Sequence, residues 1–408
     1  MTAREYPVFT VTPKAERSLR AGHPWVYGEE VTAVEGAYQN GDMVDVVSNK
    51  GRYLGTGWVN DHSKIRVRII SRNANDTFDE AFFRRRVCYA LNYRKTVMGP
   101  VDYRCCRLIF GEADQFPGLT VDRFENILVT QVLSLGMECR KDWVYRALVE
   151  LLREDGEQID AIYERNDVTI RTLEGLEQGK GFYQMEGLKT DLSGHVTITE
   201  NRIKYDVDYI EGQKTGFFLD QKYNRQAAAK LARGRRVLDC FTHTGAFALN
   251  AAAAGAEHVT AVDVSAFALE LAAENGKRNG LTNLDYKCAD VFDLLTEMAK
   301  EKKCDYDYII LDPPAFTKSR ATAKNAYHGY KEINRKAMQL LPRGGYLATC
   351  SCSHFMTDEM FRKMLREAAL DAGVTLRQIE ARQQAPDHPI LPEVPETDYL
   401  KFYLLQVV

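Results

Sequence analysis

The sequence predicts an α/β protein whose C-terminal half is an open sheet with helices packed against it. Three observations support this fold class. Residues 235–263 read as a strand, a turn, a helix, a turn and a second strand, which is one βαβ unit. Strands and helices keep alternating through the chain from residue 191. The first 75 residues instead contain short strands separated by turns, a spacing that indicates a small β-barrel.

Composition limits the classes to which this chain can belong. With 408 residues it is too long for one hydrophobic core, and 45% hydrophobic with 27% charged residues is ordinary for a globular protein. No apolar run approaches the ~20 residues that a membrane span requires. Arg4 and Glu5 interrupt the N-terminal segment, where a signal peptide would be apolar. We therefore expect a cytoplasmic protein of two or three domains with no membrane partner.

Cysteine spacing and net charge further limit the classes of protein to which this chain can belong. The nine cysteines show no metal-like or repeating spacing, so we expect reduced thiols and no metal site. The net charge of −3 argues against a surface that is basic throughout. Any contact with nucleic acid must therefore be local.

The last strand of the predicted barrel carries two arginines that alternate with apolar residues. The expected strands are 9–11, 25–27, 43–47, 53–59 and 65–70. Arg66 and Arg68 fall on one face, because strand side chains alternate between faces. Residues 1–75 contain ten Lys and Arg against eight Asp and Glu, which makes them the one mildly basic part of the chain. The strand face that carries these arginines either contacts the phosphates of a nucleic acid or is simply exposed to solvent. Charge alone favours the solvent-exposed interpretation.

Residues 76–190 form a second block, for which the pattern predicts α+β structure. Apolar residues recur at helical spacing over 78–98, with Arg84, Arg85 and Arg86 between them. A further helix is expected around 142–152, and the strand-like runs are 108–112, 119–122, 127–133 and 161–169. Nothing in this block requires catalysis, so we expect a structural or substrate-positioning part.

The βαβ unit places a carboxylate at the C-terminal tip of both of its strands. The first strand carries Asp239 and the second ends at Asp263, and open α/β sheets bind ligands beyond these tips. The turn after the first strand holds only one glycine, Gly245, whereas a turn that cradles a pyrophosphate carries three. A ligand with a ribose, a cationic end and no pyrophosphate fits better, and S-adenosylmethionine is such a ligand. The alternative is an ordinary βαβ unit with a solvated acid at each tip.

Two later strands repeat this arrangement. Leu284–Ala289 is followed by Asp290, and Tyr306–Leu311 is followed by Asp312. Four acids in register at one sheet edge favour a shared site over chance placement. A polar, glycine-bearing loop at 211–221 precedes the βαβ unit.

Two short motifs follow the last expected strands. The first is Asp312–Phe316, in which paired prolines make a rigid turn whose carbonyl groups are free to accept from a ligand amine. In nucleic-acid methyltransferases such a turn holds the ring-nitrogen edge or exocyclic amine of a flipped base, and a simple stiff strand exit is the alternative. The strand Tyr346–Ser351 then delivers the second motif. Cys350 is expected to be a small apolar side chain buried in the strand, whereas Cys352, within Ser351–Ser353, places a thiol beyond the strand end.

These residues resemble a known family, the bacterial class I methyltransferases of the large-subunit rRNA methyltransferase I type. The segments that carry the resemblance are Val237–Gly245, 211–221, Asp312–Phe316, Ser351–Ser353, Glu396–Lys401, Gly22–Val26, 111–114 and 117–119. The resemblance covers nearly the whole chain. It implies a PUA RNA-binding domain at 1–75, a central α+β domain at 76–190 and a Rossmann-like methyltransferase domain at 191–408. It also implies formation of 5-methylcytosine in 23S rRNA, naked or in an assembling large subunit.

The strand-tip pattern and the resemblance together assign the cofactor site. We expect Asp263 to bind the ribose of S-adenosylmethionine and Asp290 to meet its adenine amine. The methionine end is expected in the turn made by Asp239, Phe241, Thr244 and Gly245. From the resemblance, three further residues border the same pocket: Gln221, Lys214 and Arg225.

The expected substrate site centres on the thiol of Cys352. Carbon 5 of a pyrimidine becomes nucleophilic only after a thiolate adds to carbon 6, which requires covalent catalysis. Asp312 is expected to hold the pyrimidine edge, and no residue is assigned as the base that removes the proton from carbon 5. The remaining substrate contacts are expected from Pro313, Phe316, Arg66 and Arg68.

Three alternatives remain at this point. Ala315 occupies the position where another branch of RNA cytosine methyltransferases has a cysteine, and the single thiol of Ser351–Ser353 matches the uracil-5 arrangement. The product could then be 5-methyluracil. Methylation of an exocyclic amine would need Asp312 and Phe316 but no thiol. A non-catalytic RNA-binding ribosome assembly factor is the alternative from another class, and the acids at every strand tip argue against it.

Overall fold

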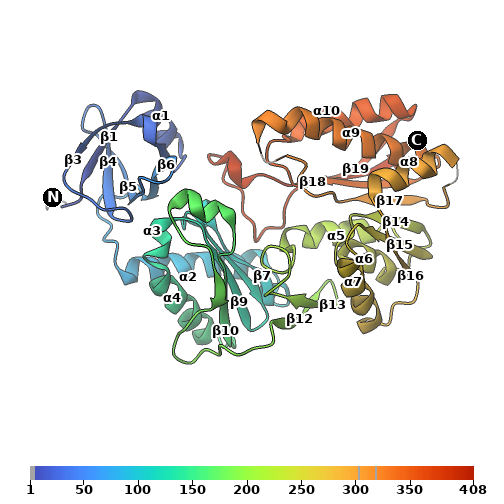
Figure 1. The fold of residues 1–408 in the computed structure, drawn as a ribbon, viewed down its shortest axis with the longest axis horizontal. Helices are drawn as coiled ribbons and strands as arrows, with labels where there is room; N and C mark the ends of the chain where they lie inside the picture. The colour runs from blue at the N-terminus through green and yellow to red at the C-terminus, as the bar shows by residue number, and fades with distance from the viewer. Residues whose placement is uncertain (1–4, 302–303, 318) are drawn as a thin grey trace. The chain divides into compact units, whose positions relative to one another are not determined.

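The computed structural model describes residues 5–301, 304–317 and 319–408, which fold into two compact units (Figure 1). The first unit comprises the chain up to residue 198 together with 207–219 and 386–397. The second comprises 199–206, 220–385 and 398–408. Residues 1–4, and with them Arg4, lie outside the described residues. None of the helices in the described ranges combines the length and hydropathy that a bilayer span needs.

The N-terminal part of the first unit is a six-stranded β-structure with strand order β2-β6-β5-β4-β1-β3. The strands are β1 (Val8–Val11), β2 (Trp25–Tyr27), β3 (Val31–Glu35), β4 (Met43–Ser48), β5 (Tyr53–Val59) and β6 (Ile65–Ser71). Helix α1 (Pro13–Ala21) begins at Thr12, whose side chain accepts from the Ala15 amide, and Pro13 suits the first helical turn. A short 3₁₀ turn, η1 (Gly28–Glu30), joins β2 to β3. The predicted small β-barrel is present, and its core contains Phe9, Leu19 and Val46.

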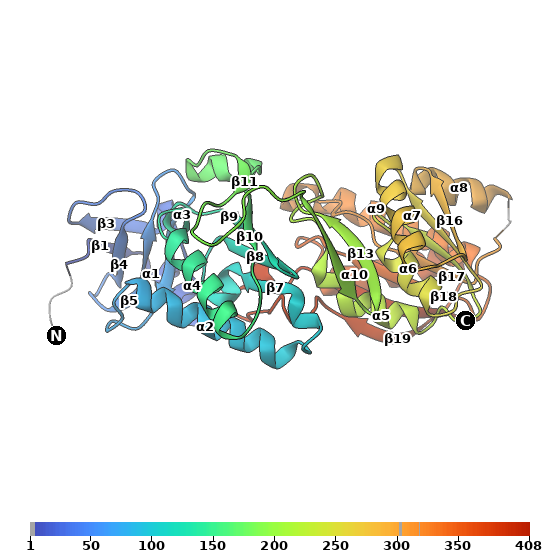
Figure 2. The same cartoon turned by 90° about the horizontal axis from the view of Figure 1, so that it is seen from below.

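The central part of the first unit is a five-stranded sheet covered by two long helices. Its strand order is β11-β10-β9-β8-β7. The strands are β7 (Cys105–Phe110), β8 (Leu119–Phe124), β9 (Ile127–Val132), β10 (Ala161–Arg165) and β11 (Lys180–Phe182). The helices are α2 (Glu80–Val97), α3 (Leu135–Glu138) and α4 (Lys141–Glu154), with 3₁₀ turns η2 (Asp102–Arg104), η3 (Gly111–Asp114) and η4 (Thr169–Glu174). Helices α2 and α4 lie side by side (Figure 2), and Arg84 of α2 donates to Glu150 and Glu154 of α4.

The barrel and the central sheet pack closely within the first unit. Gly136 of α3 lies against Trp58 of β5, so closely that a Cβ atom added to Gly136 would come within 1.9 Å of the indole ring. Trp58 is 1% exposed. Arg140 donates to the carbonyl oxygens of Gly41 and Gly136. The hairpin strands β12 (His195–Glu200) and β13 (Ile203–Asp208) pair with each other, and residues 207–219 then belong to the first unit.

The second unit contains a seven-stranded sheet with order β16-β15-β14-β17-β18-β20-β19. The strands are β14 (Arg236–Cys240), β15 (His258–Asp263), β16 (Leu284–Cys288), β17 (Tyr308–Leu311), β18 (Tyr346–Ser351), β19 (Leu376–Arg382) and β20 (Lys401–Val407). Strands β14 to β18 are parallel, and β20 is antiparallel to both of its neighbours. The chain winds outward in both directions from β14 and β17, so the strand order reverses between them. Such a switch point is where open α/β sheets form ligand sites.

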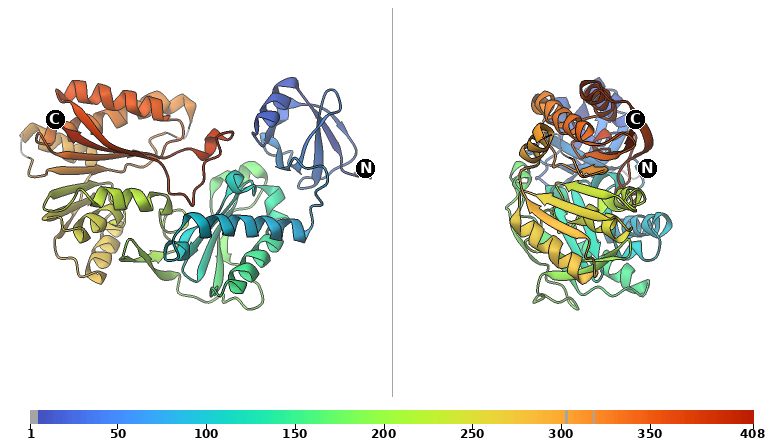
Figure 3. Two further views of the ribbon diagram at one scale, coloured as in Figure 1. Left: turned by 180° about the vertical axis from the view of Figure 1, so that it is seen from behind. Right: turned by 90° about the vertical axis from the view of Figure 1, so that its right-hand side faces the viewer.

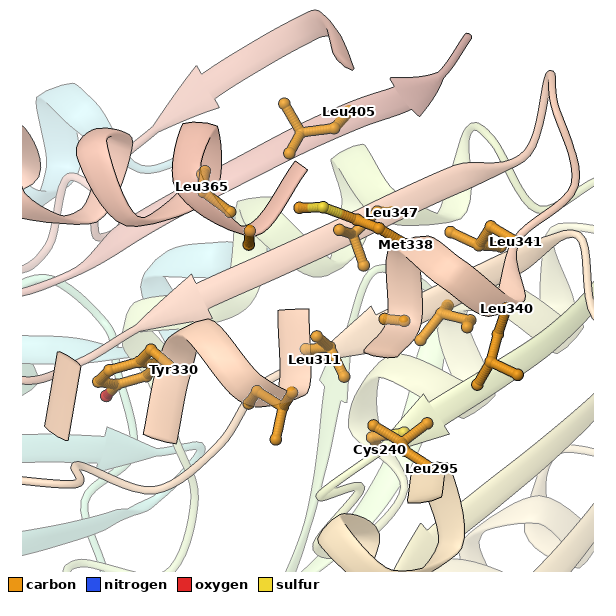
Figure 4. Close-up of a cluster of buried hydrophobic side chains, with 14 of the residues drawn as sticks. Cys240, Leu295, Leu311, Tyr330, Met338, Leu340, Leu341, Leu347, Leu365 and Leu405 are labelled. Carbon is orange, nitrogen blue, oxygen red and sulfur yellow. The ribbon is translucent and has the colours of Figure 1, made fainter. Parts of the chain in front are cut away.

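Helices cover both faces of this sheet (Figures 1 and 3). They are α5 (Lys222–Ala229), α6 (Ala246–Ala253), α7 (Ala266–Arg278), α8 (Val291–Glu301), α9 (Ala323–Leu340) and α10 (Asp358–Ala372), with 3₁₀ turns η5 (Leu219–Gln221), η6 (Arg320–Thr322) and η7 (Pro395–Thr397) along the chain. On one face α8, α9 and α10 bury a core that includes Leu311, Tyr330 and Met338 (Figure 4). On the other face the alanines of α6 pack on Val237 and Phe402. The predicted Rossmann-like sheet is confirmed.

Candidate active site

The turn after β14 begins with Asp239, whose side chain is completely buried. Its Oδ2 accepts from the Thr242 hydroxyl over 2.5 Å and from the Ala248 amide over 2.9 Å. Its Oδ1 has no hydrogen-bond partner among the described residues. Burial, together with the negative charges of Asp312 and Asp263, raises the pKa of this carboxyl to about 7. An orphaned buried acceptor needs a donor, and the ammonium group of a methionine moiety would supply one.

The backbone of this turn adopts an uncommon conformation. Phe241 and His243 have φ values of 63° and 53°, and Gly245 has φ of 84°. The left-handed region is costly for residues with a Cβ atom, and such strain concentrates at functional sites. A Cβ on Gly245 would also lie 2.5 Å from Leu249 and 2.9 Å from Ala272, so glycine is required for the close approach of α6 and α7. The structure therefore gives the single glycine of this turn a packing role.

Asp263 lies at the end of β15 and ties two turns together. Its Oδ2 accepts from the His243 amide over 2.8 Å, and its Oδ1 accepts from the Ser265 amide over 2.9 Å. Each carboxylate oxygen has a second lone pair, so a ribose hydroxyl can still bind. Asp290 is exposed two residues beyond β16, where its Oδ1 accepts from the Phe292 amide at the start of α8 over 2.7 Å.

Strand register brings the predicted acids to one edge of the sheet. Cys240 of β14 is level with Val262 of β15 and with Leu311 of β17. Asp263 and Asp312 directly follow these two partners. Asp263 and Asp312 consequently stand level with each other, two residues beyond the level of Asp239, at the edge that the strand-tip pattern predicts.

Asp312 is held by residues from the segment before α5. The Gln221 side chain donates from Nε2 to Asp312 Oδ1 over 3.0 Å, and Asn224 donates to Gln221 Oε1 over 2.7 Å. Burial and the nearby charge of Asp220 raise the pKa of Asp312 to about 6. The expectation that Gln221 borders the site agrees with this contact, and its contact with the cofactor stays a prediction.

Two other expected pocket residues have partners of their own. Arg225 is 2% exposed, and its Nε and Nη2 donate to the two carboxylate oxygens of Glu200 over 2.6 and 2.8 Å. This bidentate pair engages its guanidinium group, so Arg225 acts on the site through its charge near Asp312. Lys214 belongs to the first unit, where its ammonium lies 4.6 Å from the centre of the Phe218 ring. Its role at the cofactor stays a prediction.

The Asp-Pro-Pro turn and the Ser-Cys-Ser turn follow adjacent parallel strands, β17 and β18. Cys352 is partly buried, and its Sγ lies 3.9 Å from the carbonyl oxygen of Pro313. Cys350, by contrast, is completely buried within β18, and burial raises its pKa well above the ordinary value. The structure therefore separates the two thiols as the sequence predicts: one fills the core and the other faces the strand-tip region.

Tyr330 of α9 connects the two turns. Its hydroxyl lies 2.9 Å from the Ser353 hydroxyl, and its ring centre is 4.5 Å from that of Phe316 (Figure 4 shows the Tyr330 side chain). Phe316 also packs on Phe292 at 5.7 Å. Phe316 is partly buried between these aromatic neighbours, and its contact with a base stays a prediction.

The burial of Arg68 argues against the expectation that it contacts phosphates. It is 9% exposed, and its guanidinium donates to Glu174 Oε1 over 2.8 Å and lies 3.5 Å from Glu112 Oε1. The indole of Trp25 donates to the same Glu112 oxygen over 2.9 Å. Arg68 therefore joins the barrel to the central part of the first unit and is not available to phosphates. Arg66 is ion-paired with Asp61.

A cavity of about 640 Å³ in the first unit is lined by other basic residues. Arg20, Arg72 and Arg86 contribute to its wall, together with the carboxylates of Glu112 and Glu393. Arg86 donates to the Gln115 carbonyl over 3.1 Å, and burial lowers its pKa to about 10, so it stays cationic at neutral pH. Sequence reasoning missed this arrangement because the three residues come from α1, from the end of β6 and from α2. The triplet Arg84–Arg86 was the only signal of it.

Comparison with known proteins agrees with this architecture. A PUA-like domain model matches residues 9–72, and a model described as S-adenosylmethionine-dependent methyltransferase matches residues 183–405. The sheet order, the strained turn after β14 and the orphaned Asp239 oxygen fit the same cofactor. The protein is therefore an S-adenosylmethionine-dependent methyltransferase.

Relatives with known names specify the family. A protein of Pseudoalteromonas atlantica named ribosomal RNA large subunit methyltransferase I is 40% identical over 98% of this chain and 99% of its own length. Proteins of the same name from Aeromonas salmonicida and Shewanella denitrificans are 41% and 42% identical, over 95% and 97% of this chain and 96% and 98% of their own lengths. The chain belongs to the ribosomal RNA large subunit methyltransferase I family.

Solved structures show the same fold over nearly the whole chain. A SAM-dependent methyltransferase from Streptococcus mutans superposes with a TM-score of 0.81 at 22% identity, covering 98% of this chain and 100% of that one. A methyltransferase complexed with SAH gives 0.82 at 21% identity, with the same coverage. At this identity the similarity establishes the fold alone.

Proposed function

We propose that this protein methylates carbon 5 of a cytosine in 23S rRNA through a covalent adduct on Cys352. The curated relatives at about 40% identity are named for methylation of large-subunit ribosomal RNA. The observation that carries the proposal is the position of the thiol: Cys352 Sγ lies 3.9 Å from the Pro313 carbonyl, beside the turn that begins with Asp312. The proposed nucleophile, Cys352, and the carboxyl proposed to hydrogen-bond to the pyrimidine edge, Asp312, therefore follow neighbouring strands.

S-adenosylmethionine, when bound, supplies an electrophilic methyl group. Asp239 supports binding of its ammonium, because the Oδ1 atom lacks a partner among the described residues. Asp263, at the end of the adjacent strand, suits the ribose hydroxyls, and exposed Asp290 suits the adenine amine. Phe241, Thr244 and Gly245 shape the turn that would enclose the methionine end.

The chemistry that follows is covalent catalysis. The Cys352 thiolate adds to carbon 6, which forms an S–C bond and turns carbon 5 into a nucleophile. Carbon 5 takes the methyl group, a base removes the proton from the same carbon, and the S–C bond breaks as the double bond re-forms. The target base must leave its stack to reach such a site, at a cost of a few kcal/mol.

The state of Asp312 favours cytosine over uracil as the target. Cytosine presents an acceptor at ring nitrogen 3, whereas uracil presents an N–H donor there. Because burial raises the pKa of Asp312 to about 6, a fraction of this carboxyl is protonated near neutral pH and can donate to cytosine. The exocyclic-amine alternative gives no role to Cys352, whose Sγ lies 3.9 Å from the Pro313 carbonyl oxygen.

We further propose that the first unit provides RNA affinity and that the chain is organised as 1–75, 76–190 and 191–408. Arg20, Arg72 and Arg86 at the cavity wall supply local positive charge in a chain of net charge −3. Backbone phosphates are recognised by such groups without reading sequence. The RNA could be naked or part of an assembling subunit.

The test is a trapping experiment with RNA that contains 5-fluorocytosine. Fluorine at carbon 5 cannot leave as a proton does, so the wild-type protein should accumulate a covalent adduct on Cys352. Cys352→Ala should form no adduct and transfer no methyl group, although it should bind cofactor and RNA normally. Cys350→Ala is the matched control and should still trap RNA. Near-normal turnover by Cys352→Ala would overturn the thiol mechanism and support the exocyclic-amine alternative.

A further inference from the structure

A buried lysine lies beside the turn that carries Cys352. Lys401 is the first residue of β20 and is level with Ser351, the last residue of β18, in the antiparallel pairing of these strands. Its side chain is almost fully buried, with the residue 4% exposed. A buried ammonium is costly unless its surroundings compensate it, so its position requires an explanation.

Backbone carbonyl groups hold this ammonium in place. Lys401 Nζ donates to the carbonyl oxygen of Ser353 over 2.7 Å and to that of Tyr399 over 2.8 Å. Among the residues that the structure describes, no carboxylate forms an ion pair with it within 4.0 Å. Asp398 and Asp358 act on it only through longer-range charge, and burial lowers its pKa to about 8. The hydrogen bond to Ser353 fixes the residue that directly follows Cys352.

We infer that Lys401 is the positioning residue for Cys352: it fixes the backbone of the Ser-Cys-Ser turn, and its positive charge favours the thiolate over the thiol. The inference deepens the proposed function, because a thiolate is the species that adds to carbon 6. The charge of Lys401 interacts with Cys352. A free thiol near neutral pH is only a few per cent ionised, so a nearby cation raises the reactive fraction.

Three further titratable groups of the described residues lie near the thiol or its strand, and none of them carries a positive charge. Tyr330 of α9 and Cys350 of β18 both interact electrostatically with Cys352. The tyrosine hydroxyl and the cysteine thiol are neutral when protonated and negative when ionised, so neither supplies a positive charge. Asp312, which faces Cys350 from the neighbouring turn, is negative when ionised. Lys401 is the cation in this set, and removing its charge should therefore lower the ionised fraction of the thiol.

The test measures alkylation of Cys352 by iodoacetamide in the full-length protein, as a function of pH. The thiol loses its proton to solvent, the thiolate sulfur bonds to the reagent carbon, and iodide leaves. Peptide mass spectrometry after digestion resolves each cysteine, and the exposed thiols of Cys139 and Cys288 serve as references in the same sample. We expect the midpoint of Cys352 alkylation to lie below the midpoints of both references.

Substitutions separate the charge from the packing. Because a neighbouring cation shifts the ionisation of such a group by about one to three pH units, Lys401→Met should slow alkylation of Cys352 at pH 7 by roughly tenfold or more. Lys401→Arg keeps the charge and should retain fast alkylation. Lys363→Met, on the exposed face of α10, is the matched control and should change nothing. The reference thiols should react equally in all four proteins.

Two results would overturn the inference. One is equal alkylation of Cys352 in the wild type and in a Lys401→Met protein that still binds S-adenosylmethionine. The other is a wild-type midpoint for Cys352 at or above those of Cys139 and Cys288, which decides the matter even if Lys401→Met does not fold. Alkylation involves no RNA, so failure of the proposed reaction at carbon 5 would leave this measurement unaffected.

Discussion

The side-chain amide of Gln221 donates a hydrogen bond to Oδ1 of Asp312 over 3.0 Å. Gln221 is itself held by Asn224 of α5, which also donates to the carbonyl of Gln383. The orientation of the carboxyl group at the Asp-Pro-Pro turn is therefore set by residues from two separate segments, one at 221–224 and one at Gln383. This hydrogen bond favours the ionised carboxyl, whereas burial opposes ionisation and is the larger effect. The resulting pKa of about 6 lets Asp312 exchange a proton near neutral pH.

Asp239 should make the protein less stable as the pH rises. Its folded-state pKa is raised from 3.8 to about 7, so between these values the folded protein keeps a proton that the unfolded chain has released. Stability is then lost with rising pH across this window. We expect Asp239→Asn to be more stable than the wild type at pH 8 and to show a gain at least ~2 kcal/mol larger than its gain at pH 5.

Urea unfolding at the two pH values measures this difference. The same variant should lose cofactor affinity, because the orphaned carboxylate oxygen becomes part of a neutral amide. Asp285→Asn, at a side chain that is 73% exposed, is the control and should change neither quantity. A stability gain that is the same at pH 5 and pH 8 would contradict the burial argument.

Asp263→Ala should weaken binding of S-adenosylmethionine about tenfold or more. A charge-assisted hydrogen bond to a ribose hydroxyl contributes ~1.5–3 kcal/mol. The variant also removes the acceptor for the His243 and Ser265 amides, so the turn itself should loosen. Calorimetric titration with the cofactor provides the measurement, and Asp285→Ala provides the comparison. An unchanged dissociation constant would remove Asp263 from the site.

Arg20→Gln and Arg72→Gln should weaken RNA binding without altering cofactor binding. Each arginine that contacts a phosphate contributes close to one unit to the slope of log affinity against log salt concentration. We expect the slope to fall by about 0.7–0.9 for each substitution. Arg52→Gln is the matched control, since Arg52 is exposed on the same barrel but does not line the cavity. Equal slopes for wild type and both variants would exclude the cavity as the RNA contact.

Gly136→Ala should destabilise the first unit by roughly 1–3 kcal/mol or more. The added methyl group would overlap the Trp58 ring at 1.9 Å, and Trp58 is too buried to move away freely. Gly99→Ala is the control, because a Cβ there meets nothing within 4 Å. Thermal unfolding that follows Trp fluorescence reports the change. Equal melting temperatures for the two variants would show that the contact between α3 and the barrel relaxes easily.

Local patterns were enough to predict that acids stand at the ends of neighbouring strands. Tyr346–Ser351 is predicted and observed as a strand with the same bounds. Strand period and turn chemistry act within a few residues, so they can be read along the chain. Parallel pairing then places Asp239, Asp263 and Asp312 at one edge, because acids at equivalent strand ends must meet there.

Only the tertiary structure decided which charged side chains are free to contact a ligand and which are held within the protein. Arg68 follows a pattern that allows a phosphate-facing strand, yet it pairs with Glu174, which lies 106 residues away in the chain. Lys401 stands in a motif without an assigned role, and its contact with Ser353 spans 48 residues. Sequence periodicity specifies the face on which a side chain lies, whereas burial and ion pairing depend on the partner that folding brings to that face. The sequence by itself therefore determined where the acids and the thiol stand, and the packing of distant segments decided that Arg68 is structural and that a buried cation lies beside Cys352.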